Sequence, residues 1–290
     1  MPNISPFIIT GLAVGAVYAL SGVGLVVLYR ACGVLNFAYG AIGSIGALLA
    51  WQILEYWDVE ILAWFIAIGA STLLSFVYGR YLAPRLAYRD SVVKAVATLG
   101  FALILLGIAR WYWSDDPRHI SFQMDTVGIS ILTVRITLTR IVAFGSAVVI
   151  TIGIALFLNN ARIGLSMRAL ANNRDLSALL GIPVPQVETR AWLMSGFLAG
   201  VTGLLLADLV RLDAIVLTFM VIPAMAAAVV GRLKSLVGTL VGGILIGLFE
   251  AIATPFQTIS PYRSVIPFVV ATMVILWLQR HKQVALAKGD

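Results

Sequence analysis

The stretch ARIGLSMRALANNRDLSALLGIPVPQVE, residues 161–188, is a polar interruption in an otherwise apolar chain. Long uncharged runs lie before and after it, yet four basic residues fall within it or just beyond it: Arg162, Arg168, Arg174 and Arg190. Good helix formers dominate its first half, which favours a structured loop over a short turn. One sizeable basic loop between apolar runs predicts a membrane protein that receives a mechanical signal from a soluble partner.

The composition excludes a soluble domain. Of the 290 residues, 61% are hydrophobic and only 11% are charged, and the mean hydropathy is +1.00. Soluble globular domains carry about 25% charged residues, so this chain must be an integral membrane protein. Its net charge of +7 does not indicate nucleic-acid binding, because the basic residues lie at the ends of apolar runs and not in one patch.

Apolar runs between charged residues predict an all-α, polytopic fold with about eight or nine transmembrane helices. The first run has no basic segment before it, so we expect a retained helix and not a cleaved signal peptide. The run 214–231 is short and contains Pro223, so we expect a broken or re-entrant helix there. The predicted spans are 7–29, 34–54, 61–83, 92–113, 138–159, 191–210, 214–231, 235–254 and 264–279.

Charge is distributed unequally between the two sides of these spans. Fourteen of the 20 basic residues, but only four of the 13 acidic ones, fall on one side. By the positive-inside rule that side is cytoplasmic, which predicts an outer N-terminus, a cytoplasmic C-terminus and a cytoplasmic loop at about 160–190. The fourteen are Arg30, Arg80, Arg85, Arg89, Lys94, Arg162, Arg168, Arg174, Arg190, Arg232, Lys234, Arg280, Lys282 and Lys288.

The loop itself predicts two short helices. Residues 163–171 favour a first helix, and Asn173 or Asp175 can cap a second one that runs through Leu180. Gly181 suits the position after a helix end, and Pro183 prevents continuation. The resulting elbow carries an apolar stripe of leucines at 176, 179 and 180. Such an elbow suits either a groove on a partner protein or anionic lipid headgroups.

Glycines four residues apart predict close helix packing inside the membrane, where small residues let backbones approach. The pairs are Gly11 and Gly15, Gly196 and Gly200, Gly238 and Gly242, and Gly243 and Gly247, with a further stripe at Gly40, Gly43 and Gly46. Glu250 is the remaining polar residue of interest, and we expect it either at the membrane interface or facing a cavity.

Three separated motifs resemble one known family. The string RIGLSMRALA (162–171), followed by Asp175 and Gly181-Ile182, is similar to the coupling loop of branched-chain amino acid ABC transporter permeases. The string VLNFAYGA (34–41) resembles the first helices of that family, and SGFLAGVTG (195–203) resembles its later segments. Many relatives have His or Gln where this chain has Tyr39, and often Glu where it has Ala41, so the resemblance leaves the solute open: a branched-chain amino acid, urea or an amide.

The resemblance implies one transmembrane permease domain, 1–290, of an importer in the bacterial inner membrane. It also implies a second, similar permease subunit, two cytoplasmic ATPase subunits and an extracytoplasmic solute-binding protein. Residues of the translocation path would be Asn36, Phe37, Tyr39 and Gly40. Residues that couple to the ATPase would be Arg162, Gly164, Arg168, Ala169, Asp175 and Gly181.

The chain has no phosphate-binding motif G-x-x-x-x-G-K-[ST], so we expect ATP to be bound by partner subunits. One cysteine and two distant histidines offer no metal site, and no catalytic motif is present, so we expect neither a cofactor nor an enzyme activity. The alternative hypothesis is a stand-alone secondary carrier or channel for a small solute.

Overall fold

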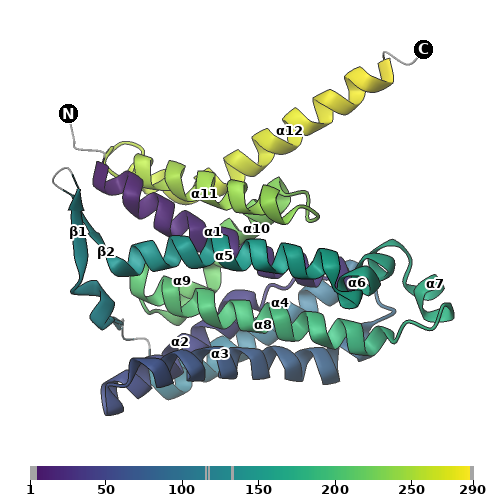
Figure 1. Ribbon diagram of the computed structural model, residues 1–290, viewed down its shortest axis with the longest axis horizontal. Coiled ribbons are helices and arrows are strands. Elements are labelled where there is room, and N and C mark those ends of the chain that lie inside the picture. Colours follow the sequence, from purple (N-terminus) through teal and green to yellow (C-terminus); the bar gives the residue numbers. More distant parts are fainter. Residues whose placement is uncertain (1–4, 115, 117, 132–133, 288–290) are drawn as a thin grey trace.

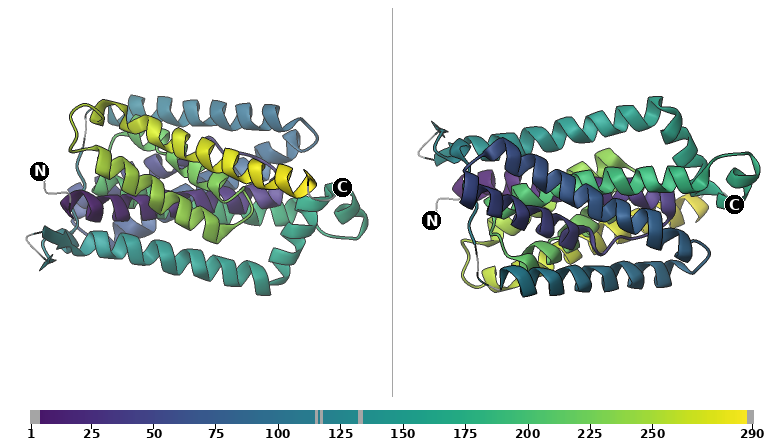
Figure 2. Two further views of the ribbon diagram at one scale, coloured as in Figure 1. Left: turned by 90° about the horizontal axis from the view of Figure 1, so that it is seen from above. Right: turned by 90° about the horizontal axis from the view of Figure 1, so that it is seen from below.

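The computed structural model of the chain describes residues 5–114, 116, 118–131 and 134–287, with the side chains of 130–135 and 278–287 left out of the description. The predicted cytoplasmic residues Arg280, Lys282 and Lys288 therefore lie outside the described side chains. Helices run side by side along the long axis of the molecule (Figures 1 and 2). The helices are α1 Ser5–Cys32, α2 Tyr39–Trp57, α3 Glu60–Val77, α4 Ser91–Trp113, α5 Leu138–Asn160, α6 Arg162–Asn172, α7 Arg174–Leu179, α8 Val184–Leu209, α9 Ala214–Phe219, α10 Val221–Val230, α11 Leu236–Ala253 and α12 Ile266–Ala287.

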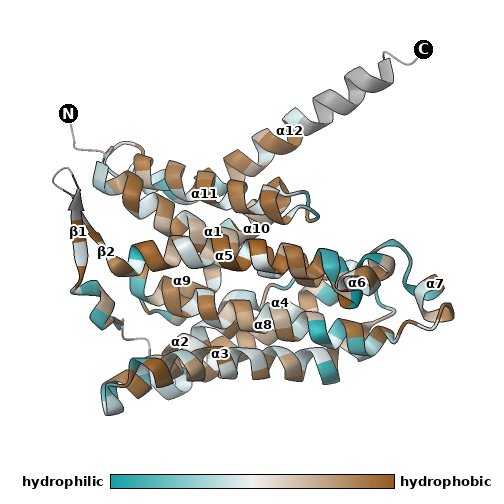
Figure 3. Ribbon diagram, viewed as in Figure 1, coloured by the Kyte–Doolittle hydropathy of each residue, from teal (hydrophilic) through white to brown (hydrophobic). Residues whose placement is uncertain are grey.

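The described residues contain seven helices long and apolar enough to cross a membrane, and a shorter apolar pair at Ala214–Val230. The all-α, polytopic prediction is therefore confirmed. Each predicted span corresponds to a helix, but α2 is not among the seven. Figure 3 shows the apolar residues along these helices and the polar ones gathered near α6 and the start of α8.

The run 214–231 is a broken helix, as predicted. It divides at Met220 into α9 and α10. Pro223 falls in the first turn of α10, where its missing N–H leaves no helical hydrogen bond unmade. The break thus places the proline where a helix tolerates it.

One predicted boundary was wrong. The helix expected from 191 begins at Val184, since Pro185 is tolerated in a first helical turn and the charged residues that follow lie within the helix. The span expected from 34, where Asn36 and Gly40 indicated an irregular start, becomes helical only at Tyr39: the Asn36 side-chain oxygen accepts a hydrogen bond from the Ala38 N–H, and residues 37–38 form a turn before the helix. The third span was predicted to end at 83. Regular α-helix in α3 ends at Val77, and the helical course continues through a π-helical turn, Tyr78–Leu82, and a 3₁₀ turn, Ala83–Leu86.

Helix α1 is the centre of the bundle. Every residue from Gly15 to Leu28 is buried, which is typical of a helix that is apolar on all sides. Its glycines meet those of α11: a Cβ on Gly15 would lie 2.9 Å from the Gly243 carbonyl oxygen, and a Cβ on Gly247 would collide with the Gly15 backbone. The predicted packing of these glycines is confirmed, and α1 and α11 approach through it.

A second close contact joins α8 to α3. A Cβ on Gly200 would lie 2.7 Å from Ile68 Cα, and Gly196 lies against Ser75. Ser75 also donates a hydrogen bond to the Trp192 carbonyl oxygen at 2.6 Å. Because these helices are held by backbone approach and an interhelical hydrogen bond, α8 and α3 form one rigid pair.

The two ends of the bundle differ. Figure 1 shows α6 and α7 at one end and the hairpin of β1 (Gly128–Ile131) and β2 (Val134–Thr137) at the other. The strands are antiparallel, with Gly128 paired to Thr137. The elbow, formed by α6 and α7, therefore lies far from the hairpin along the long axis. Helix α12 diverges from the bundle beyond its contacts with α10 and α11.

Candidate functional site

The elbow after α5 has the local structure that its residues predict. The Asn173 side-chain oxygen accepts a hydrogen bond from the Leu176 N–H at 2.9 Å and caps α7. At the other end Gly181 has a φ of +82°, the Gly181 N–H donates to the Ala178 carbonyl at 3.0 Å, and the Ile182 N–H donates to the Ser177 carbonyl at 3.1 Å. This pair of bonds is a Schellman motif, in which a glycine adopts the left-handed conformation.

The outer face of the elbow is apolar and open. Leu179 is 85% exposed and Leu180 is 73% exposed. On α6 the opposite face is covered, with Met167 and Leu170 buried among residues of the bundle. The elbow is thus anchored by α6 and presents α7 outward.

The residues assigned to coupling divide into three groups. Arg162, Asp175 and Gly181 are exposed, and Arg168 and Ala169 are half-buried. Gly164 is buried, because a Cβ there would collide with the Leu158 carbonyl at the end of α5. Gly164 permits the sharp approach of α6 to α5 and has no surface of its own to offer to a partner.

Sequence reasoning missed an ion pair that ties the elbow to the bundle. Arg174 Nε donates to Glu188 Oε1 at 2.9 Å, and Nη2 donates to Oε2 at 3.3 Å. The guanidinium carbon also lies 5.1 Å from the centre of the Tyr88 ring, in the connection between α3 and α4. The hydrogen bond to Glu188 raises the pKa of Arg174 above its ordinary value. The sequence did offer a signal for this pair, since Glu188 is a single glutamate close to several arginines of the loop. Which arginine it pairs with depends on how the elbow folds back onto α8.

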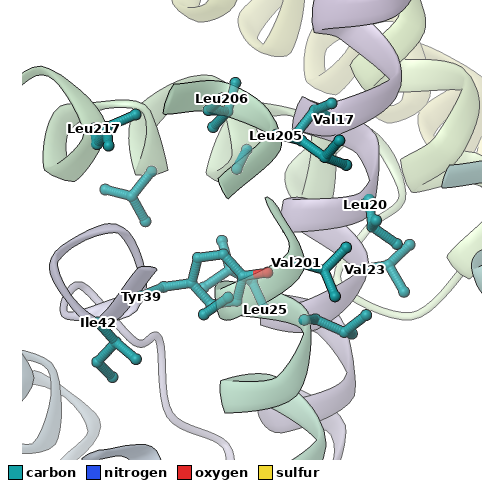
Figure 4. Close-up of a cluster of buried hydrophobic side chains, with 14 of the residues drawn as sticks. Val17, Leu20, Val23, Leu25, Tyr39, Ile42, Val201, Leu205, Leu206 and Leu217 are labelled. Atoms are coloured by element: carbon teal, nitrogen blue, oxygen red, sulfur yellow. The ribbon is translucent and has the colours of Figure 1, made fainter. Parts of the chain in front are cut away.

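The predicted path residues lie at the start of α2 and separate into two pairs. Tyr39 is buried, and its hydroxyl lies 3.2 Å from Thr202 Oγ1 on α8. Because the Thr202 hydroxyl donates to the Leu198 carbonyl at 2.8 Å, Tyr39 is the donor. Figure 4 shows Tyr39 pointing into the cluster of buried apolar side chains, toward Val201. Gly40 lies against the Leu217 and Thr218 carbonyls, so α2 and α9 touch by their backbones.

Tyr39 and Gly40 line one small cavity of about 10 Å³, together with Ser21, Gly43 and Met220. A cavity of this size has room for about one water molecule. The interior around Tyr39 is therefore closed to an organic solute in this conformation.

Asn36 and Phe37 face a different neighbour. The Phe37 N–H donates to Thr98 Oγ1 on α4 at 3.1 Å, and the Asn36 side-chain oxygen accepts from Ala38. Asn36 is buried, and its side-chain nitrogen has no hydrogen-bond partner among the described residues. The four predicted path residues are thus close in sequence, but Asn36 and Phe37 do not line the cavity at Tyr39.

Glu250, whose place the sequence left open, is half-buried on α11. It interacts with the Tyr18 hydroxyl on α1, which in turn lies 3.3 Å from Met220 Sδ at the break between α9 and α10. Glu250 therefore belongs to the contact between α1, α11 and the broken helix.

Comparison with known proteins identifies the family of the chain. The family described as "Branched-chain amino acid transport system / permease component" matches residues 7–276. The high-affinity branched-chain amino acid transport system permease protein BraD of Pseudomonas aeruginosa is 27% identical over 298 residues, covering 96% of this chain and 95% of the relative. LivH of Escherichia coli K12, a permease protein of the same description, is 24% identical over 281 residues, covering 92% and 91%. The probable LivH of Methanocaldococcus jannaschii is 27% identical over 245 residues, covering 81% and 76%. Since the family match extends over nearly the whole chain and all three of these relatives are transport permeases, this multi-pass membrane protein belongs to the branched-chain amino acid transport system permease family.

Proposed function

We propose that the chain is the permease subunit of an ATP-driven importer, and that it moves branched-chain amino acids or a related small polar solute across the inner membrane. One observation carries this proposal: an exposed apolar elbow is joined by the Arg174–Glu188 ion pair to α8, whose Thr202 holds Tyr39 in the closed interior. A displacement of the elbow would therefore reach the cavity through a single helix.

The first step is at the elbow. An ATPase subunit docks on the apolar face of α7 and on the exposed Arg162 and Asp175. Nucleotide binding to that subunit then moves the elbow. Leu179 and Leu180 supply the apolar anchor that such helix-in-groove contacts need. Arg168 and Ala169 lie half-buried beneath, so they respond to that movement through α6.

The second step is in the bundle. Helix α8 is continuous from Val184 to Leu209, a length of about 39 Å at 1.5 Å per residue, and so acts as a lever. The glycine contact of α8 with α3 keeps the two helices together. Movement of α8 shifts Thr202 relative to Tyr39 and opens the cavity to one side or the other.

The orientation and the partners complete the proposal. The charge asymmetry supports an outer N-terminus, a cytoplasmic elbow and eight or nine spans in one domain. A second, similar permease, two ATPase subunits and an extracytoplasmic solute-binding protein form the rest of the importer. ATP is bound by the ATPase subunits, and this chain holds no cofactor.

The decisive experiment is reconstitution of the importer in liposomes. Arg168→Glu is expected to leave membrane insertion and assembly intact and to abolish amino-acid uptake and the stimulation of ATPase activity. Arg85→Glu is the matched control, because Arg85 is exposed on the same side but lies outside the elbow. Normal uptake by the Arg168→Glu importer would contradict the coupling role.

A second arm tests the alternative of a stand-alone carrier. The purified chain alone, in liposomes with a solute gradient, is expected to transport nothing, and mild detergent is expected to extract it together with an ATPase subunit. Gradient-driven uptake by the lone chain would overturn the importer proposal.

A further inference from the structure

A pocket of about 290 Å³ lies between α2, α4 and the start of α9. It is at the end of the bundle opposite the elbow, which the charge asymmetry assigns to the outside. Its volume is close to the lower limit for small-molecule sites, so it suits a solute smaller than a typical drug. Both signs of charge and an aliphatic wall line it.

The positive side of the pocket is held in place. Arg118 donates from Nη1 to the Asp116 carbonyl at 3.3 Å and from Nη2 to the Trp113 carbonyl. Its guanidinium lies 4.6 Å from the centre of the Trp51 ring. Since its backbone also pairs with Leu212, with N–H to carbonyl distances of 3.1 and 3.2 Å, Arg118 is pre-oriented at the pocket. Arg110 on α4 also lines the pocket.

The negative side and the apolar side come from other elements. Asp213 has a side chain that is 19% exposed, and it accepts hydrogen bonds from the Ile215 N–H and from Arg211. The Val216 N–H donates a third hydrogen bond to the same carboxylate. Three of its roughly four acceptor positions are therefore used, which leaves about one for a ligand. Leu48 and Leu212 are buried and form the aliphatic wall. A guanidinium, a carboxylate and an aliphatic surface together complement an α-amino acid: a carboxylate, an ammonium and an aliphatic side chain.

The pocket shares two helices with the cavity at Tyr39. On α2, Leu48 lines the pocket and Gly43 lines the cavity, five residues or about 7.5 Å apart along the helix axis. On α9, Ile215 lines the pocket and Leu217 lines the cavity. Along α2, a solute in the pocket is therefore one to two helical turns from the nearest lining residue of the cavity, Gly43.

We propose that this pocket is an outer binding site within the permease for an aliphatic α-amino acid in its zwitterionic form, and that it holds the solute before the cavity at Tyr39 opens. The proposal rests on the proposed function. Arg110 and Arg118 bind the carboxylate, and Asp213 attracts the ammonium group.

Two glycines of α4 provide the test. Gly107 lines the pocket, and a Cβ on Gly107 would meet no atom within 4 Å, so a larger side chain fills the pocket without disturbing the fold. Gly100 lies two turns earlier on the same face of the helix, also meets no atom, and does not line the pocket. Gly107→Leu and Gly100→Leu thus make the same change in the same helix, and only the first blocks the site.

The first measurement is saturation-transfer NMR with L-leucine on the assembled importer, without the solute-binding protein, in nanodiscs of phosphatidylcholine. The wild type and Gly100→Leu are expected to transfer magnetisation to the leucine methyl groups, and Gly107→Leu is expected to lose the signal. L-Leucinamide, which lacks the carboxylate, is expected to give little transfer. Equal signals from the two variants, or from the amide and the acid, would overturn the proposal.

The second measurement is leucine uptake by the complete importer in liposomes. Gly107→Leu is expected to lower the rate by about tenfold or more, because the new side chain takes the place of the solute's aliphatic group and so removes its buried contact with the pocket. Gly100→Leu is expected to stay near the wild type. If the wild type takes up no amino acid, the proposed function fails. If it does and the two variants are alike, only the pocket inference fails. A Gly107→Leu defect that requires anionic lipid would assign the pocket to a lipid headgroup and overturn the inference.

Discussion

Arg174 and Glu188 form a two-bonded ion pair across the elbow, with Nε 2.9 Å from Oε1 and Nη2 3.3 Å from Oε2. The pair joins the start of α7 to the first turns of α8 across the connection between them. Glu188 is only 8% exposed, and a buried carboxylate without a partner is strongly unfavourable. The pair therefore makes the elbow move with α8 instead of swinging freely.

Replacing Arg174 should uncouple the elbow from α8. Arg174→Ala is expected to destabilise the protein by about 1.5–3 kcal/mol, the range for hydrogen bonds to charged groups. It should also reduce ATPase-driven uptake more than ATPase binding. Arg174→Lys keeps the charge but not the forked geometry and should recover only part of the loss. Thermal unfolding of the two variants and of each combined with Glu188→Gln measures the coupling, and an additive double variant would contradict it.

The contribution of this pair should not depend on pH near neutrality. The pKa of Arg174 is raised by the Glu188 hydrogen bond, so its share of the stability is present below the ordinary arginine pKa and is lost only as the pH rises above it. Between about pH 6 and 9 arginine stays protonated in both the folded and the unfolded chain. The double-variant coupling energy, measured at both limits, should be the same, and a decline toward pH 9 would refute this account.

The apolar face of α7 should carry the affinity for the ATPase subunit. Leu179→Asp removes a leucine contact worth about 1.5–3 kcal/mol, which weakens assembly roughly tenfold to a hundredfold. Asn172→Asp adds the same charge at an exposed position of the same elbow and removes no apolar contact, so it is the control. Co-purification of the ATPase subunit with each variant measures the effect. If the two variants bind equally, then the leucines face lipid headgroups.

The Tyr39–Thr202 hydrogen bond should stabilise the closed interior weakly. Tyr39→Phe is expected to cost about 0.6 kcal/mol, the average for interhelical hydrogen bonds in membranes, and to raise the fraction of the open form. Thr202→Val should have a comparable effect, and the double variant should add little. Unfolding curves report on stability, and the access of a water-soluble thiol reagent to Val221→Cys, at a residue that lines the cavity, reports on opening. A closed interior in Tyr39→Phe would contradict the gating role.

The contact of α1 with α11 should tolerate no side chain. Gly247→Leu drives a side chain into the Gly15 backbone, and overpacking costs typically about 1–3 kcal/mol or more. Gly153→Leu on α5 meets no atom and should be neutral. Monodispersity and melting temperature in detergent distinguish the two, and equal behaviour would argue against the glycine contact.

Local features of this protein could be predicted from its residues because they depend on near neighbours. The apolar runs, the break near Pro223, the Asn173 cap and the Gly181 helix end each follow from a few consecutive side chains. The start of α8 was misjudged because its charged residues indicated a loop, while Glu188 has a partner that only the folded elbow supplies. The orientation and the exact number of spans stay predictions.

By itself the sequence determined that the chain is a helical membrane protein, where its glycine stripes lie and which segment forms the elbow, because composition and helical periodicity act along the chain. Only the tertiary structure decided that Gly15 faces Gly247, that Arg174 reaches Glu188, and that Arg118 and Asp213 line one pocket. Such pairings depend on which helix faces join, and many arrangements of the same apolar helices bury similar surface in lipid. Backbone approach at the glycines and the partners of a few buried charges select one of them.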